Sequence, residues 1–206
     1  MKRFLIVIAV IAVILLIGDY VLRGVAENAA ADLIDEQIAQ EVEPEVELGG
    51  FPFLRSVLTG TFDEITITIP DVAQGPLLVE DIVLTLRDVR LEALEVLAGR
   101  GDLRAASLKG RGVISESTLN EVVGAQYPGL TITIEKDRVS VSRNGTTVAA
   151  NAVVAGNRLL FQAGELAAPL EVPLPELLPE VLFSSLRATP GELVLQVIGT
   201  RVRVRT

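Results

Sequence analysis

The sequence contains no cysteine, no histidine and no tryptophan among its 206 residues. These absences exclude a disulfide scaffold, a zinc site built on Cys or His, a Cys nucleophile and a Ser-His-Asp triad. Basic residues are also scarce, because 18 Lys and Arg face 27 Asp and Glu, for a formal net charge of −9. Binding to nucleic acid needs clustered positive charge, so this balance argues against a nucleic-acid partner.

Catalytic motifs are missing as well. There is no Gly-x-Ser-x-Gly elbow, phosphate loop, dinucleotide fingerprint or EF-hand loop. The adjacent carboxylates Asp63-Glu64 and Glu80-Asp81 would point to opposite faces of a strand, so a solvated acidic surface explains them better than a glycosidase pair. With only two Tyr to stack on sugars, a glycoside hydrolase remains a disfavoured alternative. We therefore expect no catalytic residues and no metal site.

Met1-Lys2-Arg3 precedes an unbroken apolar run from Phe4 to Ile17. At about 1.5 Å per residue the run spans roughly 21 Å, less than a ~30 Å hydrocarbon core unless the helix continues past Asp19. We interpret residues 1–18 as a signal anchor, and a cleaved signal peptide or a buried core helix are the alternatives. Both export interpretations place residues 19–206 outside the cytoplasm, and the signal-anchor interpretation keeps residues 4–17 as the membrane anchor.

Apolar residues between Asp19 and Val42 recur at helical spacing and predict a long amphipathic helix that ends before Pro44 and the Gly49-Gly50 pair. Its predicted buried stripe comprises Leu22, Val25, Ala26, Ala29, Leu33, Ile34 and Ile38. The segment 50–54 that follows is expected to be an apolar loop or a short helix. Further helices are predicted at residues 92–98, from Ser115 or Ser117 to Tyr127, and around Val181, Leu182 and Leu186 after a Pro-rich stretch.

The rest of the chain has the period of two that is typical of β-strands. Strands are predicted at 65–69, closed by Pro70, and at 82–91, 103–114, 130–134, 139–141, 146–155, 159–161 and 193–204. The alternating apolar residues switch between even-numbered and odd-numbered positions at Arg87-Asp88 and again at Gly199-Thr200. These two changes of parity predict two β-bulges that bend the sheet. Asn144-Gly145 predicts a hairpin turn, with a glycosylation sequon at Asn144 as the alternative use of the same residues. We therefore expect residues 19–206 to form one α+β domain, in which a strongly curved antiparallel sheet packs on amphipathic helices.

Two groups of residues are candidates for binding. The first is an apolar cluster of Phe51, Phe53, Leu54 and Leu58, to which Phe62 is added as a groove residue. It is interpreted as a hydrophobic lip at a membrane or ligand entrance, or alternatively as part of the core. The second is the stripe of Arg201, Arg203 and Arg205 on one face of the last strand, which would meet anionic headgroups or simply face solvent.

The layout resembles the actinobacterial LmeA-like family of phospholipid-binding envelope proteins. The likeness lies in the apolar anchor, the amphipathic helix, Gly50-Phe51-Pro52-Phe53-Leu54, the segment 58–65, Leu86-Arg87-Asp88-Val89, the helix before Tyr127-Pro128 and the Pro-rich segment before the last strand. The resemblance implies a tubular lipid-binding-like fold, with the curved sheet wrapped around a long helix, and an apolar groove for acyl chains. It implies a bound phospholipid and no other cofactor. It also implies a non-catalytic role in lipid handling or envelope glycolipid maturation at the outer face of the inner membrane, in the periplasm or cell envelope. The implied partners are phospholipid, a membrane surface and a membrane-bound glycolipid enzyme. A scaffolding envelope protein without lipid is the alternative.

Overall fold

The structure is a computed structural model that describes residue 13 and residues 16–32, 44–74, 77–91, 102–164, 169–174 and 180–205. Its described helices are residues 16–32, α2 (Phe53–Thr59) and α4 (Glu116–Gln126). Its strands are β1 (Glu45–Leu48), β2 (Thr61–Gln74), β3 (Leu77–Arg90), β4 (Asp102–Ser115), β5 (Leu130–Glu135), β6 (Arg138–Arg143), β7 (Thr146–Ala155), β8 (Arg158–Gln162), β9 (Leu170–Pro173), β10 (Val181–Thr189) and β11 (Glu192–Arg205).

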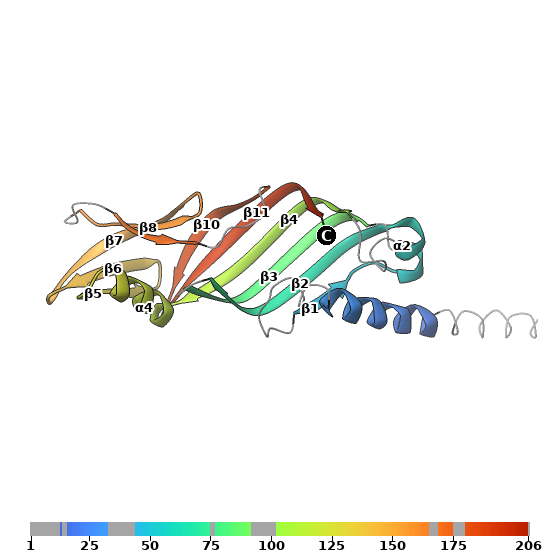
Figure 1. The fold of residues 1–206 in the computed structure, drawn as a ribbon, viewed down its shortest axis with the longest axis horizontal. Helices are drawn as coiled ribbons and strands as arrows, with labels where there is room; N and C mark the ends of the chain where they lie inside the picture. Colours follow the sequence, from blue (N-terminus) through green and yellow to red (C-terminus); the bar gives the residue numbers. More distant parts are fainter. Residues whose placement is uncertain are drawn as a thin grey trace, which may run out of the picture.

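The strands form two antiparallel sheets. Sheet A has the order β1-β2-β3-β4-β11-β10, and sheet B has the order β5-β6-β7-β8-β9, so sheet B is inserted in the chain between two strands of sheet A. Figure 1 shows an elongated molecule in which the sheets lie end to end and the helix of residues 16–32 extends from the end far from sheet B. The predicted α+β class and curved antiparallel sheet are confirmed. A long helix enclosed by the sheet is not seen in the described ranges.

Strand β4 of sheet A lacks side chains at two positions on its inner face, Gly110 and Gly112, where neighbouring side chains lie close to its backbone. A methyl group added at Gly110 would lie 2.5 Å from Leu84 Cδ2 and 2.6 Å from Val197 Cγ2. The side chains of the flanking strands β3 and β11 therefore occupy the space that a side chain at Gly110 would need. Gly112 plays the same part beside Val79. Glycine in a strand interior commonly marks such close approach.

A row of four residues crosses sheet A. At this row the buried residues of each long strand switch between odd-numbered and even-numbered positions, which is a change of parity. The row consists of Asp63, Asp88, Ala106 and Arg201, and we call it the parity row. On either side of it the pairing keeps one register, as Arg87↔Ser107 and Val89↔Ala105 show for β3 and β4. Asp88 and Arg201 have positive φ, 50° and 52°. The predicted parity changes are thus confirmed, but they are not bulges, because no strand gains a residue relative to its neighbour.

The apolar side chains form two cores. The first core lies between sheet B, α4 and the adjoining ends of β3, β4 and β11, and the second core lies at the other end of sheet A with β1 and α2. Fully buried residues of the first core include Ile114, Leu119, Ile132, Leu159, Phe161 and Leu193. The second core includes Leu48, Phe53, Phe62, Ile65, Leu86, Val89 and Val202. The long strands therefore connect two separate packing regions.

Helix α4 begins at the predicted cap Ser115, whose Oγ accepts a hydrogen bond from Thr118 N at 3.4 Å. Its side chains also cover the free edge of β5. The Asn120 amide donates to Ile132 O at 2.8 Å and accepts from Ile132 N at 2.6 Å, while Glu116 accepts from Ile134 N at 2.6 Å. A strand edge that would otherwise expose unpaired backbone groups is thereby satisfied.

Several predicted boundaries are wrong. Pro70 lies inside β2, which continues to Gln74. The ladder between β1 and β2 ends at Glu45↔Thr68, so β2 is an edge strand at Pro70, and an edge tolerates a residue without an N–H. A bulge does occur in β3, but it lies between Glu80 and Val83, where the register against β4 shifts.

Residues 181–189 form the strand β10 and not the predicted helix. They pair with β11 from Val181↔Gly199 to Thr189↔Glu192, and a register shift between Phe183 and Ser185 disrupts the alternation of the sequence. Strands β1 and β9 were not predicted either, because each has only four residues. The predicted helix at 92–98 and the stripe residues Leu33, Ile34 and Ile38 lie outside the described residues.

Candidate functional site

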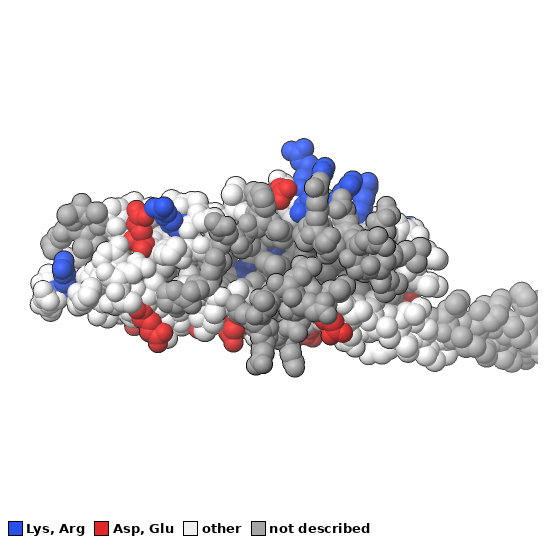
Figure 2. Space-filling view, viewed as in Figure 1, with Lys and Arg blue, Asp and Glu red and all other residues white. Residues whose placement is uncertain are grey.

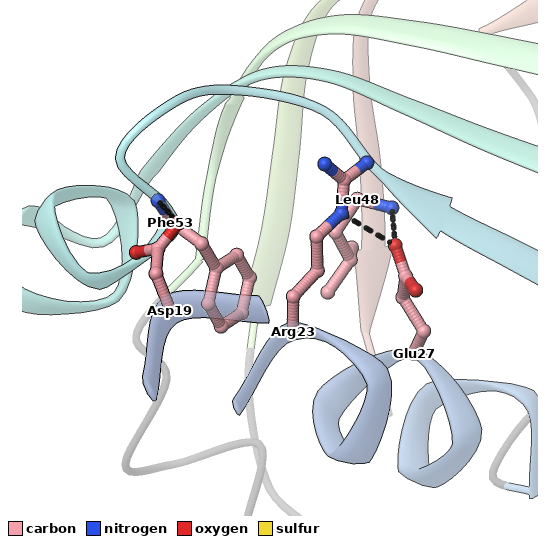
Figure 3. A network of polar contacts seen from close by, with 5 residues as sticks. All are labelled: Asp19, Arg23, Glu27, Leu48 and Phe53. Carbon is pink, nitrogen blue, oxygen red and sulfur yellow. Dashed lines mark hydrogen bonds and ion pairs between the residues drawn. The ribbon is translucent and has the colours of Figure 1, made fainter. Parts of the chain in front are cut away.

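Two carboxylates attach the helix of residues 16–32 to the end of sheet A (Figure 3). Asp19 accepts hydrogen bonds from Phe53 N at 2.9 Å and Leu54 N at 2.7 Å. Glu27 accepts from Leu48 N at 2.8 Å and pairs with Arg23 Nε at 2.9 Å. The helix is therefore fixed to β1 and to the start of α2 at the same time.

Asp19 acts as the N-terminal cap that α2 lacks in its own sequence. The residue before α2 is Pro52, which makes no side-chain capping hydrogen bond. The first N–H groups of any helix need an acceptor and favour a negative charge. Asp19 supplies both from 34 residues earlier in the chain. Sequence reasoning treated Asp19 only as the end of the apolar run, since no local pattern shows a partner that distant.

Large apolar side chains remain exposed where this helix meets α2. On the helix they are Leu16, Ile17, Tyr20, Val21, Leu22 and Val25, and beside α2 they are Phe51, Leu54 and Leu58. We call these nine residues the apolar end. The small residues Ala26, Ala30 and Ala31 are the ones that pack against the second core. The predicted buried stripe is thus correct at Ala26 but wrong at Leu22 and Val25, which face outward.

The structure separates the residues of the predicted lip. Phe51 and Leu58 are 73% and 79% exposed, and Leu54 is also exposed. Phe53 and Phe62 are 2% and 3% exposed and lie in the second core with ring centroids 6.0 Å apart. Phe53 turns its ring toward the helix in Figure 3. A contact of any of these residues with lipid stays a prediction. Only Phe51, Leu54 and Leu58 are exposed enough to make one.

The predicted arginine stripe lies beside two arginines that the sequence did not single out. Arg201 and Arg203 are exposed on the outer face of β11 and line a surface pocket of about 270 Å³ together with Arg90, Arg104 and Asp88. Arg205 stands opposite Asp102 at the end of β11, and its side chain lies outside the described residues. Arg90 and Arg104 were missed because only strand pairing, which is long-range, brings them to this face.

Two negative findings concern the described part of the chain. No helix there is long and apolar enough to cross a bilayer. No three Asp or Glu side chains gather there into a group suited to a metal ion.

Comparison with known proteins identifies the family. No curated protein and no solved structure matches the chain at a significant level. The family model described as LmeA-like phospholipid-binding matches residues 17–205, which is nearly the whole chain. That range contains the helix with its two anchoring carboxylates, both sheets and the arginine pocket. The chain therefore belongs to the LmeA-like phospholipid-binding family.

Proposed function

We propose that this protein is a non-catalytic phospholipid-binding protein of the cell envelope that meets the membrane with its apolar end. The apolar end is the observation that carries the proposal. It places nine large apolar side chains on the surface of one end of the molecule, while the opposite end has a closed core. Exposed patches of this kind mark contacts with membranes, ligands or other proteins, and the phospholipid-binding family favours the membrane.

The acyl chains are proposed to lie along the inner face of sheet A. This face is lined by aliphatic residues, and Ile67, Ile82 and Leu84 on it are only partly buried between the two cores. Burial of each CH₂ group contributes about 0.8 kcal/mol, so ten of them give a gross term near 8 kcal/mol before the entropy cost of ordering the chain. Binding would then be a partition of acyl chains from the bilayer and would need no reacting group.

The sequence and the family support the proposed cellular role. Residues 4–17 are proposed to hold the protein at the outer face of the inner membrane, with residues 1–18 as signal anchor and 19–206 as the lipid-binding domain. The last two residues of the apolar run, Leu16 and Ile17, are helical and exposed, as an anchor that continues into the domain requires. The proposed role is the handling of lipid for envelope glycolipid maturation, with a membrane-bound enzyme as partner.

Native mass spectrometry of purified residues 19–206, with extraction of the bound lipid, tests the proposal. We expect a diacyl phospholipid bound to the chain and uptake of a fluorescent phospholipid from vesicles. A chain that carries no lipid and takes up none would favour the scaffolding alternative and contradict the proposal.

The membrane contact is tested separately by F51S/L58S. Both side chains are mostly exposed, so we expect a near-native melting temperature and a severalfold loss of vesicle binding. L182S is the matched control, because Leu182 is also exposed but lies on β10, at the far edge of sheet A from β1. Equal vesicle binding by F51S/L58S and L182S would remove the apolar end from the contact.

A further inference from the structure

Three arginines stand directly opposite one another across three neighbouring strands. The pairing register places Arg90 of β3 opposite Arg104 of β4, and Arg104 opposite Arg203 of β11. All three are exposed, while their neighbours Val89, Ala105 and Val202 are buried on the inner face. The three guanidinium groups therefore share the outer face of sheet A. With Arg201 they make four arginines around one pocket, which we call the arginine pocket.

This arrangement is unfavourable for an isolated sheet. Like charges directly opposite on one face repel each other, and the cost grows where several converge. The ion pairs that the structure describes involve Arg23, Arg87, Arg158 and Arg187, and none of them involves Arg90, Arg201 or Arg203. Among the described residues that line the pocket there are four arginines and one acidic residue, Asp88, in a chain whose overall charge is −9. Such a concentration of charge suits an anion.

The parity row gives the pocket its shape. Asp88, Ala106 and Arg201 belong both to the row and to the pocket lining. Each strand presents two consecutive residues outward at the row, and Asp88 and Arg201 adopt positive φ there. The outer face is therefore hollowed at the point where the arginines converge, and planar guanidinium groups bind phosphate oxygens two at a time.

The pocket lies at the same end of sheet A as the apolar end. Arg90 is opposite Thr61, which comes directly after α2 and Gly60, and Leu91 N donates to Gly60 O at 2.8 Å. With strands about 4.8 Å apart, the backbones of the three paired arginines lie roughly 5 to 15 Å from the backbone of Thr61, which begins β2. In Figure 2 Lys and Arg gather along the upper edge over β4 and β11, whereas most visible Asp and Glu lie along the lower side.

We infer that the arginine pocket binds a phosphate group, carried by the headgroup of a phospholipid in the membrane that the apolar end contacts. The lipid source rests on the proposed function, whereas the phosphate chemistry rests on the pocket itself. A soluble phosphate ester has the same chemistry and is the other source to be distinguished. Apolar insertion together with basic side chains at headgroup level is the combination that gives selective binding to anionic membranes.

The test compares R90Q/R203Q with R111Q/R143Q, which removes the same charge from exposed strand positions outside the pocket. Binding is measured on vesicles of phosphatidylcholine with and without phosphatidic acid. We expect R90Q/R203Q to lose about tenfold in affinity for the anionic vesicles at low salt and to keep its affinity for neutral ones. Its melting temperature should not fall, because the substitution removes repulsion between paired strands.

Inorganic phosphate provides the second arm. If millimolar phosphate raises the melting temperature of the wild type and competes with anionic vesicles, but has neither effect on R90Q/R203Q, the pocket accepts soluble phosphate. Loss of vesicle binding without a phosphate effect assigns the pocket to headgroups. Equal behaviour of R90Q/R203Q and R111Q/R143Q in both arms overturns the inference. A wild type that binds no vesicle and carries no lipid contradicts the proposed function instead, and the phosphate arm still decides the chemistry of the pocket.

Discussion

The two ends of the molecule are built from the same long strands but differ in how their apolar side chains are covered. At the end near sheet B, α4 covers the edge of β5 and the first core buries Leu119, Leu159 and Phe161 completely. At the other end, the helix of residues 16–32 packs with alanines and leaves residues such as Tyr20 and Val25 exposed. The exposure of large apolar side chains at the apolar end is therefore a local feature, because the same chain buries such side chains completely at the other end. Both ends have a buried core, but only the apolar end leaves large apolar side chains exposed, and this is the surface that we propose meets the membrane.

The largest expected effect separates buried from exposed rings within the apolar end itself. F53S should cost about 3 to 5 kcal/mol in the free energy of unfolding, because it leaves a cavity beside Phe62 and a buried hydroxyl. F51S should cost about 1 kcal/mol or less while it lowers lipid uptake. Urea denaturation and fluorescent-lipid uptake measure the two effects. Similar destabilisation by both substitutions would erase the distinction between the two rings.

A second substitution tests how tightly the closed end is fixed. N120A should cost about 1 to 3 kcal/mol, since the Ile132 N–H and C=O lose their partners at the edge of β5. The exposed Asn151 on β7 provides the control, and N151A should change the stability by less than about 0.5 kcal/mol. Denaturation of both variants gives the comparison. A neutral N120A would mean that α4 does not protect this edge.

The attachment of the helix at the apolar end is expected to be weaker. D19A should cost about 1 kcal/mol, as loss of a helix cap usually does, and should raise hydrogen exchange at Phe53 and Leu54. D32A removes an exposed carboxylate of the same helix and should leave exchange unchanged. Unaltered exchange at α2 in D19A would show that the second core alone holds the helix in place.

The smallest effect is expected on the outer face of sheet A. Arg87 Nε and Glu64 Oε2 are 3.1 Å apart, but both side chains are largely exposed, at 62% and 43%. R87Q should therefore change the stability by less than about 0.5 kcal/mol and leave binding to anionic vesicles unaltered. Vesicle binding of R87Q beside R90Q/R203Q sharpens the boundary of the arginine pocket. A loss with R87Q equal to that of the pocket variant would extend the site beyond its described lining.

Features that depend on neighbouring residues in the sequence were predictable. The alternation of Leu130, Ile132 and Ile134, the Asn144-Gly145 turn and the Ser115 cap each lie within a few residues and appear as predicted. The parity changes near Asp88 and Gly199 were also visible as patterns. Their structural cause could not be predicted. A β-bulge in one strand and a parity change shared by all paired strands give the same pattern in the sequence of a single strand.

Features that depend on pairing between distant segments were not predictable. Residues 181–189 have apolar spacing that fits a helix, and only the ladder with β11 makes them a strand. Pro70 is tolerated because β1 ends before it. The same limit applies to the site. Arg203 was found as part of a stripe within one strand, whereas its neighbours Arg90 and Arg104 come from strands whose register no local pattern reveals.

The parity row also constrains how the chain length of this domain can change. Removing Asp88 alone would shift one half of β3 by a residue against both neighbours, so that Arg90 would face the position of Phe62. Removing Asp63, Asp88, Ala106 and Arg201 together would keep every other pairing and every buried position. We therefore expect that a single deletion in the parity row disrupts the fold. A change of length at the row has to occur in all four strands at once.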